Sequence, residues 1–176
     1  MFGHWEADSV IGTGANLHTE VERKTRFLMA RIIPDKSAAA SVGAQLAMFR
    51  ALPEGARISV THDNGTEFAR HTRLRDELGM ATTFADPYVS WQRASCENRN
   101  GMIRRYLPKR CTITMDMARE VQEIVDETDN RPMRSDTAHR PKPSLTNCYT
   151  YKPDNSVALS FRQRRLAKEG LEDLSL

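Results

Sequence analysis

The sequence has few residues that could cross-link the chain and no segment that could span a membrane. Its 176 residues include only three cysteines, Cys96, Cys111 and Cys148, which lie far apart and form no Cys-x-x-Cys pair. That spacing argues against a disulfide framework and against a zinc ribbon, and it favours a reducing compartment. The first residues, MFGHWEADS, carry acids where a signal peptide carries bases, and no apolar run reaches the length of a membrane span. We therefore expect a cytoplasmic protein without a membrane partner.

Charge and length set loose bounds on the class of protein. A length of 176 residues suits one domain with a real hydrophobic core. The net charge of +3 and the isoelectric point near 8.9 permit a polyanionic partner such as nucleic acid, but they do not require one.

The apolar patterns predict an alternation of strands and helices. A glycine-rich turn, GTGAN, separates the first two strands, and Gly79 is placed to end a helix. The order is a three-strand meander followed by alternating helices and strands, which predicts an α/β fold: a mixed five-stranded sheet flanked by helices. The predicted strands span 4–11, 17–25, 26–33, 56–61 and 81–84, and the predicted helices span 38–51, 68–78, 96–107 and 114–130.

One short stretch, THDNGTEF, places a carboxylate where a strand ends. Asp63 leaves the predicted fourth strand and is followed at once by Asn64 and Gly65, which tolerate a sharp turn and left-handed backbone. Two more carboxylates can reach it, because Asp8 lies inside the first strand and Glu97 in the first turn of a helix. Carboxylates that converge without basic partners are suited to hard divalent cations, and two ions can clamp an in-line phosphoryl displacement.

Plain structural roles remain open for each of these acids. Asp63 is also typical of a turn or helix cap, and Glu97 of a residue that favours the helix dipole. A plain structural role is harder to assign to Asp8, because aspartate is rare inside strands. The alternative for Asp8 is that its strand lies at the edge of the sheet and the side chain faces water.

Several motifs together resemble the catalytic core of bacterial DDE transposases, most closely the insertion-sequence family numbered thirty. They are WEAD, THDNGTEF, FADPYVSWQRASCENRNGMIRRYLPK and DNRP, and thirty-three residues separate Asp63 from Glu97 (97 − 63 − 1). Arg93 and Arg104 flank Glu97 in the manner of that family. The resemblance runs from about residue 3 to 132.

The resemblance implies a ribonuclease H-like, retroviral-integrase-like fold. It implies Asp8, Asp63 and Glu97 as catalytic metal ligands for two ions of Mg²⁺ or Mn²⁺. The implied reaction is cleavage at transposon ends and strand transfer into target DNA. The partners would then be transposon-end and target DNA and, when active, further copies of the chain, with no small-molecule substrate. Family members carry an end-reading helix-turn-helix region before the core, and the sequence has no counterpart of it.

Basic residues after Glu97 suggest a track for the DNA backbone. From residue 98 to 115 there are five bases and no acid. Trp91, on the loop before Glu97, is a candidate for stacking on an unpaired base, with a role in the core as its alternative. The predicted DNA-binding set is Trp91, Arg93, Arg99, Asn100, Arg104, Arg105, Lys109 and Arg110, and a solvated helix face is the alternative for its basic members.

Two domains are predicted, a catalytic core over 1–132 and a loop-rich extension with a basic helix over 133–176. Two other functions stay open: a generic ribonuclease H-like nuclease, and a non-catalytic remnant that binds only DNA or a full-length transposase. An assay that compares strand joining with simple cutting would distinguish a transposase from a generic nuclease.

Overall fold

The computed structural model describes residues 2–86 and 94–131. The loop that holds Trp91 and Arg93, and the extension over 133–176 with its predicted basic helix, lie outside the described residues.

A five-stranded mixed sheet forms the centre of the molecule. Its strands are β1 (His4–Ile11), β3 (Asn16–Glu22), β4 (Leu28–Ile33), β5 (Ser59–His62) and β6 (Ala81–Phe84). Their order across the sheet is β4-β3-β1-β5-β6. The meander β1-β3-β4 is antiparallel, whereas β5 and β6 add parallel to β1 and to each other. The first strand is therefore central and lies beside β5.

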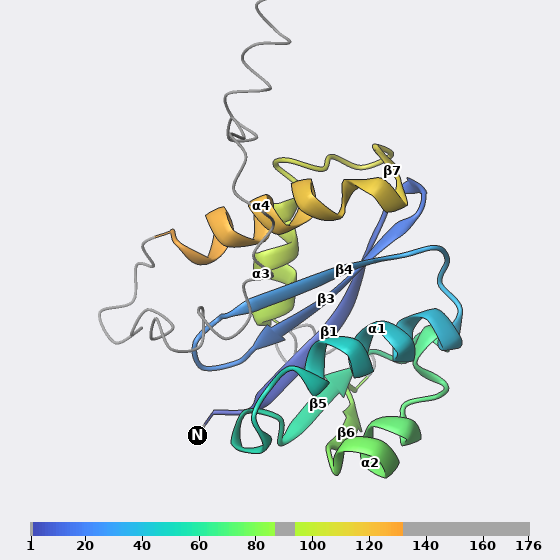
Figure 1. Ribbon diagram of the computed structural model, residues 1–176, viewed down its shortest axis with the longest axis vertical. Helices are drawn as coiled ribbons and strands as arrows, with labels where there is room; N and C mark the ends of the chain where they lie inside the picture. The colour runs from blue at the N-terminus through green and yellow to red at the C-terminus, as the bar shows by residue number, and fades with distance from the viewer. Residues whose placement is uncertain (1, 87–93, 132–176) are drawn as a thin grey trace, which may run out of the picture.

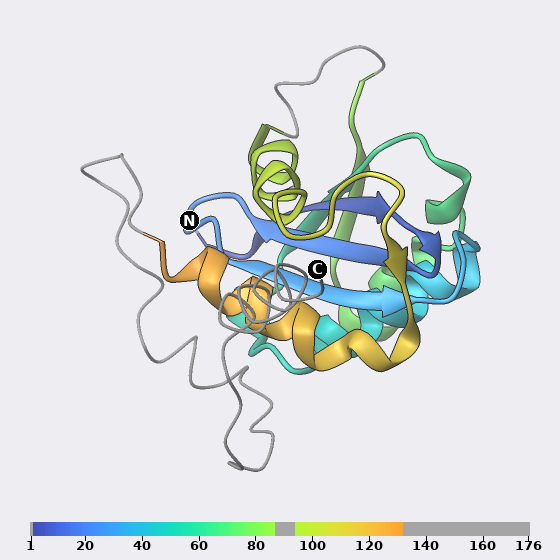
Figure 2. The same cartoon turned by 90° about the horizontal axis from the view of Figure 1, so that it is seen from above.

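Helices cover both faces of this sheet (Figure 1). The helices of the first half are α1 (Ala38–Arg50), the 3₁₀ turns η1 (Glu54–Ala56) and η2 (Thr66–Phe68), and α2 (Thr72–Leu78); those of the second half are α3 (Ala94–Ile103), the 3₁₀ turn η4 (Met115–Met117) and α4 (Ala118–Asp129). In Figures 1 and 2, α1 and α2 lie on one side and α3 and α4 on the other. The predicted start of α1 and end of α2 hold because their signals are local: the Ser37 side chain accepts from the Ala40 amide, and Gly79 ends α2 at φ +68°. Other predicted bounds are corrected: α2 begins at Thr72 and not at 68, and the helix predicted over 96–107 is α3, Ala94–Ile103.

Two apolar clusters fill the space between the sheet and its helices. The cluster under α1 includes Trp5, Phe49 and Phe68, and the cluster under α3 and α4 includes Leu17, Ile103 and Ile124. Because successive side chains of a strand point to opposite faces, β1 and β4 contribute to both clusters.

The GTGAN turn does more than join two strands. Within it, β2 (Thr13–Gly14) pairs in parallel with β7 (Thr112–Ile113), a second small sheet. A Cβ built on Gly12 would lie 2.7 Å from the Ile113 side chain, so only glycine allows this approach. A two-residue pairing between distant segments has no periodicity, and the sequence did not predict β7.

The described residues contain no helix of the length and apolarity that a membrane crossing requires.

Candidate active site

Asp8 and Asp63 belong to neighbouring strands of the sheet, since Asp8 lies within β1 and Asp63 directly follows the last residue of β5. Strand β1 pairs with β5 so that His4 lies opposite Ser59 and Glu6 opposite Thr61, an offset of 55 residues (61 − 6). The pairing ends there, and the same offset continued for two residues would bring Asp8 beside Asp63 (8 + 55 = 63). Asp8 is on the same face of β1 as Glu6, since side chains alternate along a strand. Asp8 and Asp63 are both partly exposed.

Helix α3 contacts that face and holds Asp8. The Asn100 amide donates to Oδ2 of Asp8 at 2.9 Å, and the Thr19 hydroxyl donates to Oδ1 of Asn100 at 3.0 Å. The other carboxylate oxygen of Asp8 accepts from the Ser9 amide at 2.8 Å. Asn100, which is 9% exposed, therefore orients a carboxylate. Its predicted contact with DNA is corrected to this role, because its amide is already committed within the protein.

Gly65 allows the turn that holds Asp63, although not for the reason that the sequence suggested. Its amide donates to Oδ1 of Asp63 at 2.8 Å. Its φ is −69°, and Asn64 is not among the residues with positive φ, so neither uses left-handed backbone. A Cβ on Gly65 would instead lie 2.7 Å from Oδ1 of Asp63 and against the carboxylate of Glu67. A side chain at position 65 would therefore displace the carboxylates of Asp63 and Glu67 from their present positions.

Glu67 is an acid beside Asp63 that the sequence reading missed. It is 6% exposed and pairs with Lys36 at 3.0 Å. The signal was available in THDNGTEF, where Glu67 follows Asp63 by four residues in the turn η2.

Glu97 lies on the flank of α3 that is directed toward β5. Its neighbour Arg99 faces α4, where it donates to the carbonyl oxygen of Thr128 at 2.8 Å. Two residues of a helix are about 200° apart around the axis, so Glu97 is on the opposite flank. Helix α4 packs on β4, at the far edge of the sheet from β5. Glu97 is exposed and thus belongs to the side of Asp63.

The donor set suits a hard divalent cation, although it is not assembled as a cluster. Among residues 2–86 and 94–131, no three His, Cys, Asp or Glu side chains lie close enough together to hold a metal ion. Asp8 and Asp63 supply carboxylate oxygens on one face, which is the ligand type that Mg²⁺ prefers. The convergence of all three acids therefore stays a prediction.

The basic residues after Glu97 divide into two groups. Arg99 is removed from the DNA-binding set, because it is 3% exposed and pairs with Asp129 of α4 at 3.6 Å. Arg104 is partly exposed, and one of its guanidinium nitrogens donates to the Ile11 carbonyl at 2.9 Å. Arg105, Lys109 and Arg110 are exposed.

The opposite face carries a buried polar network directly under the site. The Gln45 amide of α1 donates to Oε1 of Glu20 at 2.7 Å and contacts Nε2 of His62 at 2.9 Å, while His18 contacts the same Glu20 oxygen at 2.8 Å. Burial, reinforced by the neighbouring His18 and His71, lowers the pKa of His62 to about 3. The ring is therefore neutral at pH 7, and its Nε2 can accept from Gln45. His62 precedes Asp63, so this network fixes the end of β5.

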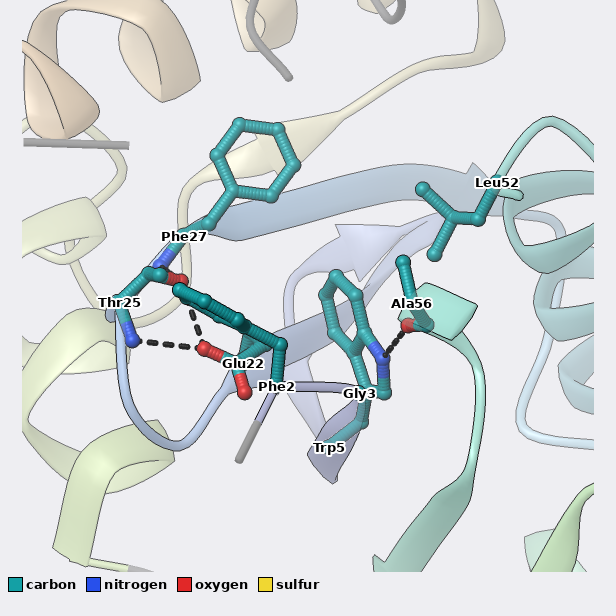
Figure 3. Close-up of a pocket in the computed structure, with 8 residues that line it drawn as sticks. All are labelled: Phe2, Gly3, Trp5, Glu22, Thr25, Phe27, Leu52 and Ala56. Atoms are coloured by element: carbon teal, nitrogen blue, oxygen red, sulfur yellow. Dashed lines mark hydrogen bonds between the residues drawn. The ribbon is translucent and has the colours of Figure 1, made fainter. Parts of the chain in front are cut away.

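A small apolar pocket lies at the other end of β1 (Figure 3). Phe2, Trp5, Phe27 and Leu52 are among the residues that line it, and the Trp5 indole donates to the Ala56 carbonyl at 2.8 Å. One oxygen of the Glu22 carboxylate accepts from the amide and the hydroxyl of Thr25, whereas the other, Oε1, is buried without a hydrogen-bond partner among the described residues. The pocket offers no reactive group and is separate from the carboxylates.

The fold and the carboxylates define a class of protein. In fold, the chain is similar to the crystal structure of the catalytic core domain of BIV integrase, with a TM-score of 0.60 and 18% identity, over 84% of this chain and 95% of that chain. The predicted ribonuclease H-like, retroviral-integrase-like fold is confirmed.

The sequence comparison is more specific. The chain is 35% identical over 143 residues to the transposase for insertion sequence element IS1086 of Cupriavidus metallidurans, covering 80% of this chain and 42% of that protein. It is also 35% identical over 141 residues to transposase InsI for insertion sequence element IS30C of Escherichia coli, covering 80% of this chain and 37% of that protein. The predicted resemblance to the insertion-sequence family numbered thirty is therefore confirmed. The chain spans about two-fifths of the length of these relatives. No family model matches it.

Proposed function

We propose that this chain is the catalytic core of a DDE transposase, which cleaves transposon ends and joins the freed 3′-hydroxyl to target DNA. The observation that supports the proposal is the parallel pairing of β1 with β5, in which Asp8 follows the paired Glu6 by two residues and Asp63 follows the paired Thr61 by two residues. The similarity to transposases of bacterial insertion sequences supports the same reaction.

Asp8, Asp63 and Glu97 would hold two divalent ions, Mg²⁺ or Mn²⁺, which when bound stabilise the charge that develops on the phosphoryl oxygens. The chain's own residues prepare the site. Asn100 fixes the plane of the Asp8 carboxylate, and the Gly65 amide fixes Asp63. Glu97 is exposed on a helix of ten residues, so its backbone is placed while its side chain is free to turn toward the other two acids.

DNA is the proposed partner, both as transposon end and as target. Arg105, Lys109 and Arg110 are exposed and follow α3, where they can contact phosphates without reading sequence. Trp91 and Arg93 stay in the proposal from the sequence alone. The active form is proposed to be a homo-oligomer, and the place of action is the cytoplasm, where the DNA of a bacterial element lies.

A joining assay tests this function. The chain is incubated with Mg²⁺ or Mn²⁺ and a labelled duplex that carries the terminal repeat found beside its reading frame. Products longer than the substrate, lost when chelator is added, are expected for a transposase core. Cutting without joining would instead support a generic nuclease.

A second candidate is a remnant that binds DNA or a full-length transposase without catalysis. Duplex binding with neither cutting nor joining would support it.

A further inference from the structure

Glu6 is a fully buried carboxylate in the same strand as Asp8. It is 1% exposed and lies two residues before Asp8, on the same face of β1. Both of its oxygens are used. Oε2 accepts from the backbone amide of Cys96 at 2.9 Å, and Oε1 accepts from Nε of Arg23 at 3.1 Å. The Arg23 side chain is 45% exposed, so the ion pair reaches solvent on one side only.

The Cys96 amide belongs to the first turn of α3, which begins at Ala94. The amides of a first turn have no partner inside their own helix, and a carboxylate is a favourable acceptor for them. Glu6 thus joins the start of α3 to the middle of the sheet across ninety residues of sequence. The next residue after Cys96 is Glu97.

Two contacts together fix where α3 lies along β1. Glu6 holds Cys96, and Asp8 holds Asn100. Two residues of a strand span about 6.6 Å, and four residues of a helix rise about 6 Å, so the two spacings match. A carboxylate at every second position of the strand therefore meets α3 at two points one turn apart, and Glu97 lies between them.

We propose that Glu6 is a positioning residue, which sets the start of α3 so that the Glu97 carboxylate can meet Asp8 and Asp63 around a divalent cation. The inference rests on the proposed function for the role of those three acids. Asp8 and Asn100 alone would leave the first turn of α3 free to fray, because Asn100 lies one turn further along. The role of Glu6 is to hold the backbone, and its carboxylate is not a ligand, since both oxygens are already bonded inside the protein.

The test measures Mn²⁺ binding by electron paramagnetic resonance, with a short DNA duplex present, so that the readout does not depend on catalysis. Glu6→Met keeps a long side chain but removes the acceptor, and it should weaken Mn²⁺ binding by about tenfold, the lower end of what residues behind metal ligands contribute. Glu6→Gln keeps an oxygen for the Cys96 amide and should stay close to wild type. The matched control is Arg23→Met, which removes the other partner of Glu6 and should also stay close to wild type.

Amide hydrogen exchange over 94–98 provides the second readout. Exchange should be faster in Glu6→Met than in Glu6→Gln or Arg23→Met, because only the first loses the acceptor of the Cys96 amide. If Glu6→Met does not fold, Glu6→Asp replaces it, since the shorter side chain keeps the charge but loses the reach.

The outcomes separate the inference from the proposed function. Unchanged Mn²⁺ affinity in a folded Glu6→Met, or an equal loss in Arg23→Met, overturns the inference, while joining by the wild type would leave the proposed function standing. Mn²⁺ affinity that depends on Glu6 in a chain that neither cuts nor joins DNA supports the inference and removes the function. A wild type that binds no Mn²⁺ overturns both.

Discussion

The two faces of the sheet both carry carboxylates in mid-strand, and they use them in opposite ways. Asp8 on β1 lies opposite Thr19 of β3, whereas Glu20, the next residue along β3, lies opposite Ala7 and points to the other face. Glu20 is fully buried and bonded to His18 and Gln45. Asp8 is partly exposed, and it accepts from Asn100 on a helix that leaves solvent access.

Enclosure decides which of these carboxylates can act on a substrate. Under α1, Glu20 is fully enclosed by protein, and its Oε1 is bonded to His18 and Gln45. The buried carboxylate therefore specifies how α1 meets the sheet. Under α3, Asp8 and Asp63 keep exposed surface and can take a further ligand. The buried Glu20 is thus a structural element, whereas the partly exposed Asp8 is a candidate catalytic group.

The largest expected effect is at Asp63. Asp63→Asn keeps the shape of the side chain but removes one anionic ligand, so metal-dependent nicking should fall by at least about a hundredfold, because a metal ion contributes several kcal/mol to the transition state. Nicking of a labelled duplex is measured across Mg²⁺ concentrations. Asp76→Asn, an exposed acid on α2, is the control and should be unchanged. Undiminished nicking by Asp63→Asn would place the chemistry elsewhere.

A substitution on the face of the sheet under α1 should lower the stability of the protein and leave its DNA nicking unchanged. Gln45→Leu takes a donor from Glu20 and His62 and leaves buried polar atoms unsatisfied, so the free energy of unfolding should fall by about 3 kcal/mol. Urea denaturation measures this. Gln122→Leu, the same change on the partly exposed side of α4, should cost little. Nicking per folded molecule should match wild type, and a selective loss of activity would contradict the division between the faces.

A pH dependence is expected where α3 meets α4. Burial raises the pKa of Asp129 to about 7, although Arg99 acts to lower it. A raised pKa means that the folded state favours the neutral acid, so this contribution is complete below about pH 4 and is lost as the pH rises through 7. It should remove about 2 kcal/mol of stability between pH 5 and pH 8.

The pKa of His62 is lowered, so its contribution to the free energy of unfolding rises with pH over the same range and opposes that of Asp129. The measurement is therefore the difference in unfolding free energy between wild type and Asp129→Asn at the two pH values, which should shift in favour of the variant at pH 8. Asp116→Asn, at an exposed acid, is the control. A difference that does not change with pH would mean that Asp129 stays charged in the folded state.

The smallest effect is expected on DNA affinity. The double variant Arg105→Ala with Lys109→Ala removes two exposed phosphate contacts, and it should weaken binding to all duplexes alike and reduce the salt slope by about two. Fluorescence anisotropy across salt concentrations, with a terminal-repeat duplex and a scrambled one, measures both. Arg119→Ala on α4 should leave the slope unchanged. A variant that weakens only the terminal-repeat complex would show that these residues read sequence.

The sequence predicted the elements where the signal is local. Strand β1 was placed with its observed bounds, and the cap at Ser37 and the stop at Gly79 were identified, because each depends on neighbours in the chain. It failed where the reason lies at a distance. Strand β7 pairs with a turn about a hundred residues earlier, and Gly65 leaves room for two carboxylates, whereas its own φ is ordinary.

The same limit explains the errors at the site. Arg99 and Asn100 were both predicted to contact DNA, because sequence gives residue type and spacing but not the direction in which each side chain leaves the helix. Their burial depends on contacts with α4 and β1, respectively.

What the sequence determined by itself is the order of the elements, the resemblance to transposases and the three candidate acids, since composition, periodicity and motif spacing are properties of the chain. What only the tertiary structure decided is which acids are enclosed. Glu6, Asp8 and Glu20 are all mid-strand carboxylates in the printed sequence. The order of the strands makes β1, with Asp8, the neighbour of β5, which Asp63 follows, and the docking of α3 on β1 gives Glu6 the amide of Cys96 as a partner. These differences arise from contacts between residues far apart in the chain, which no local pattern encodes.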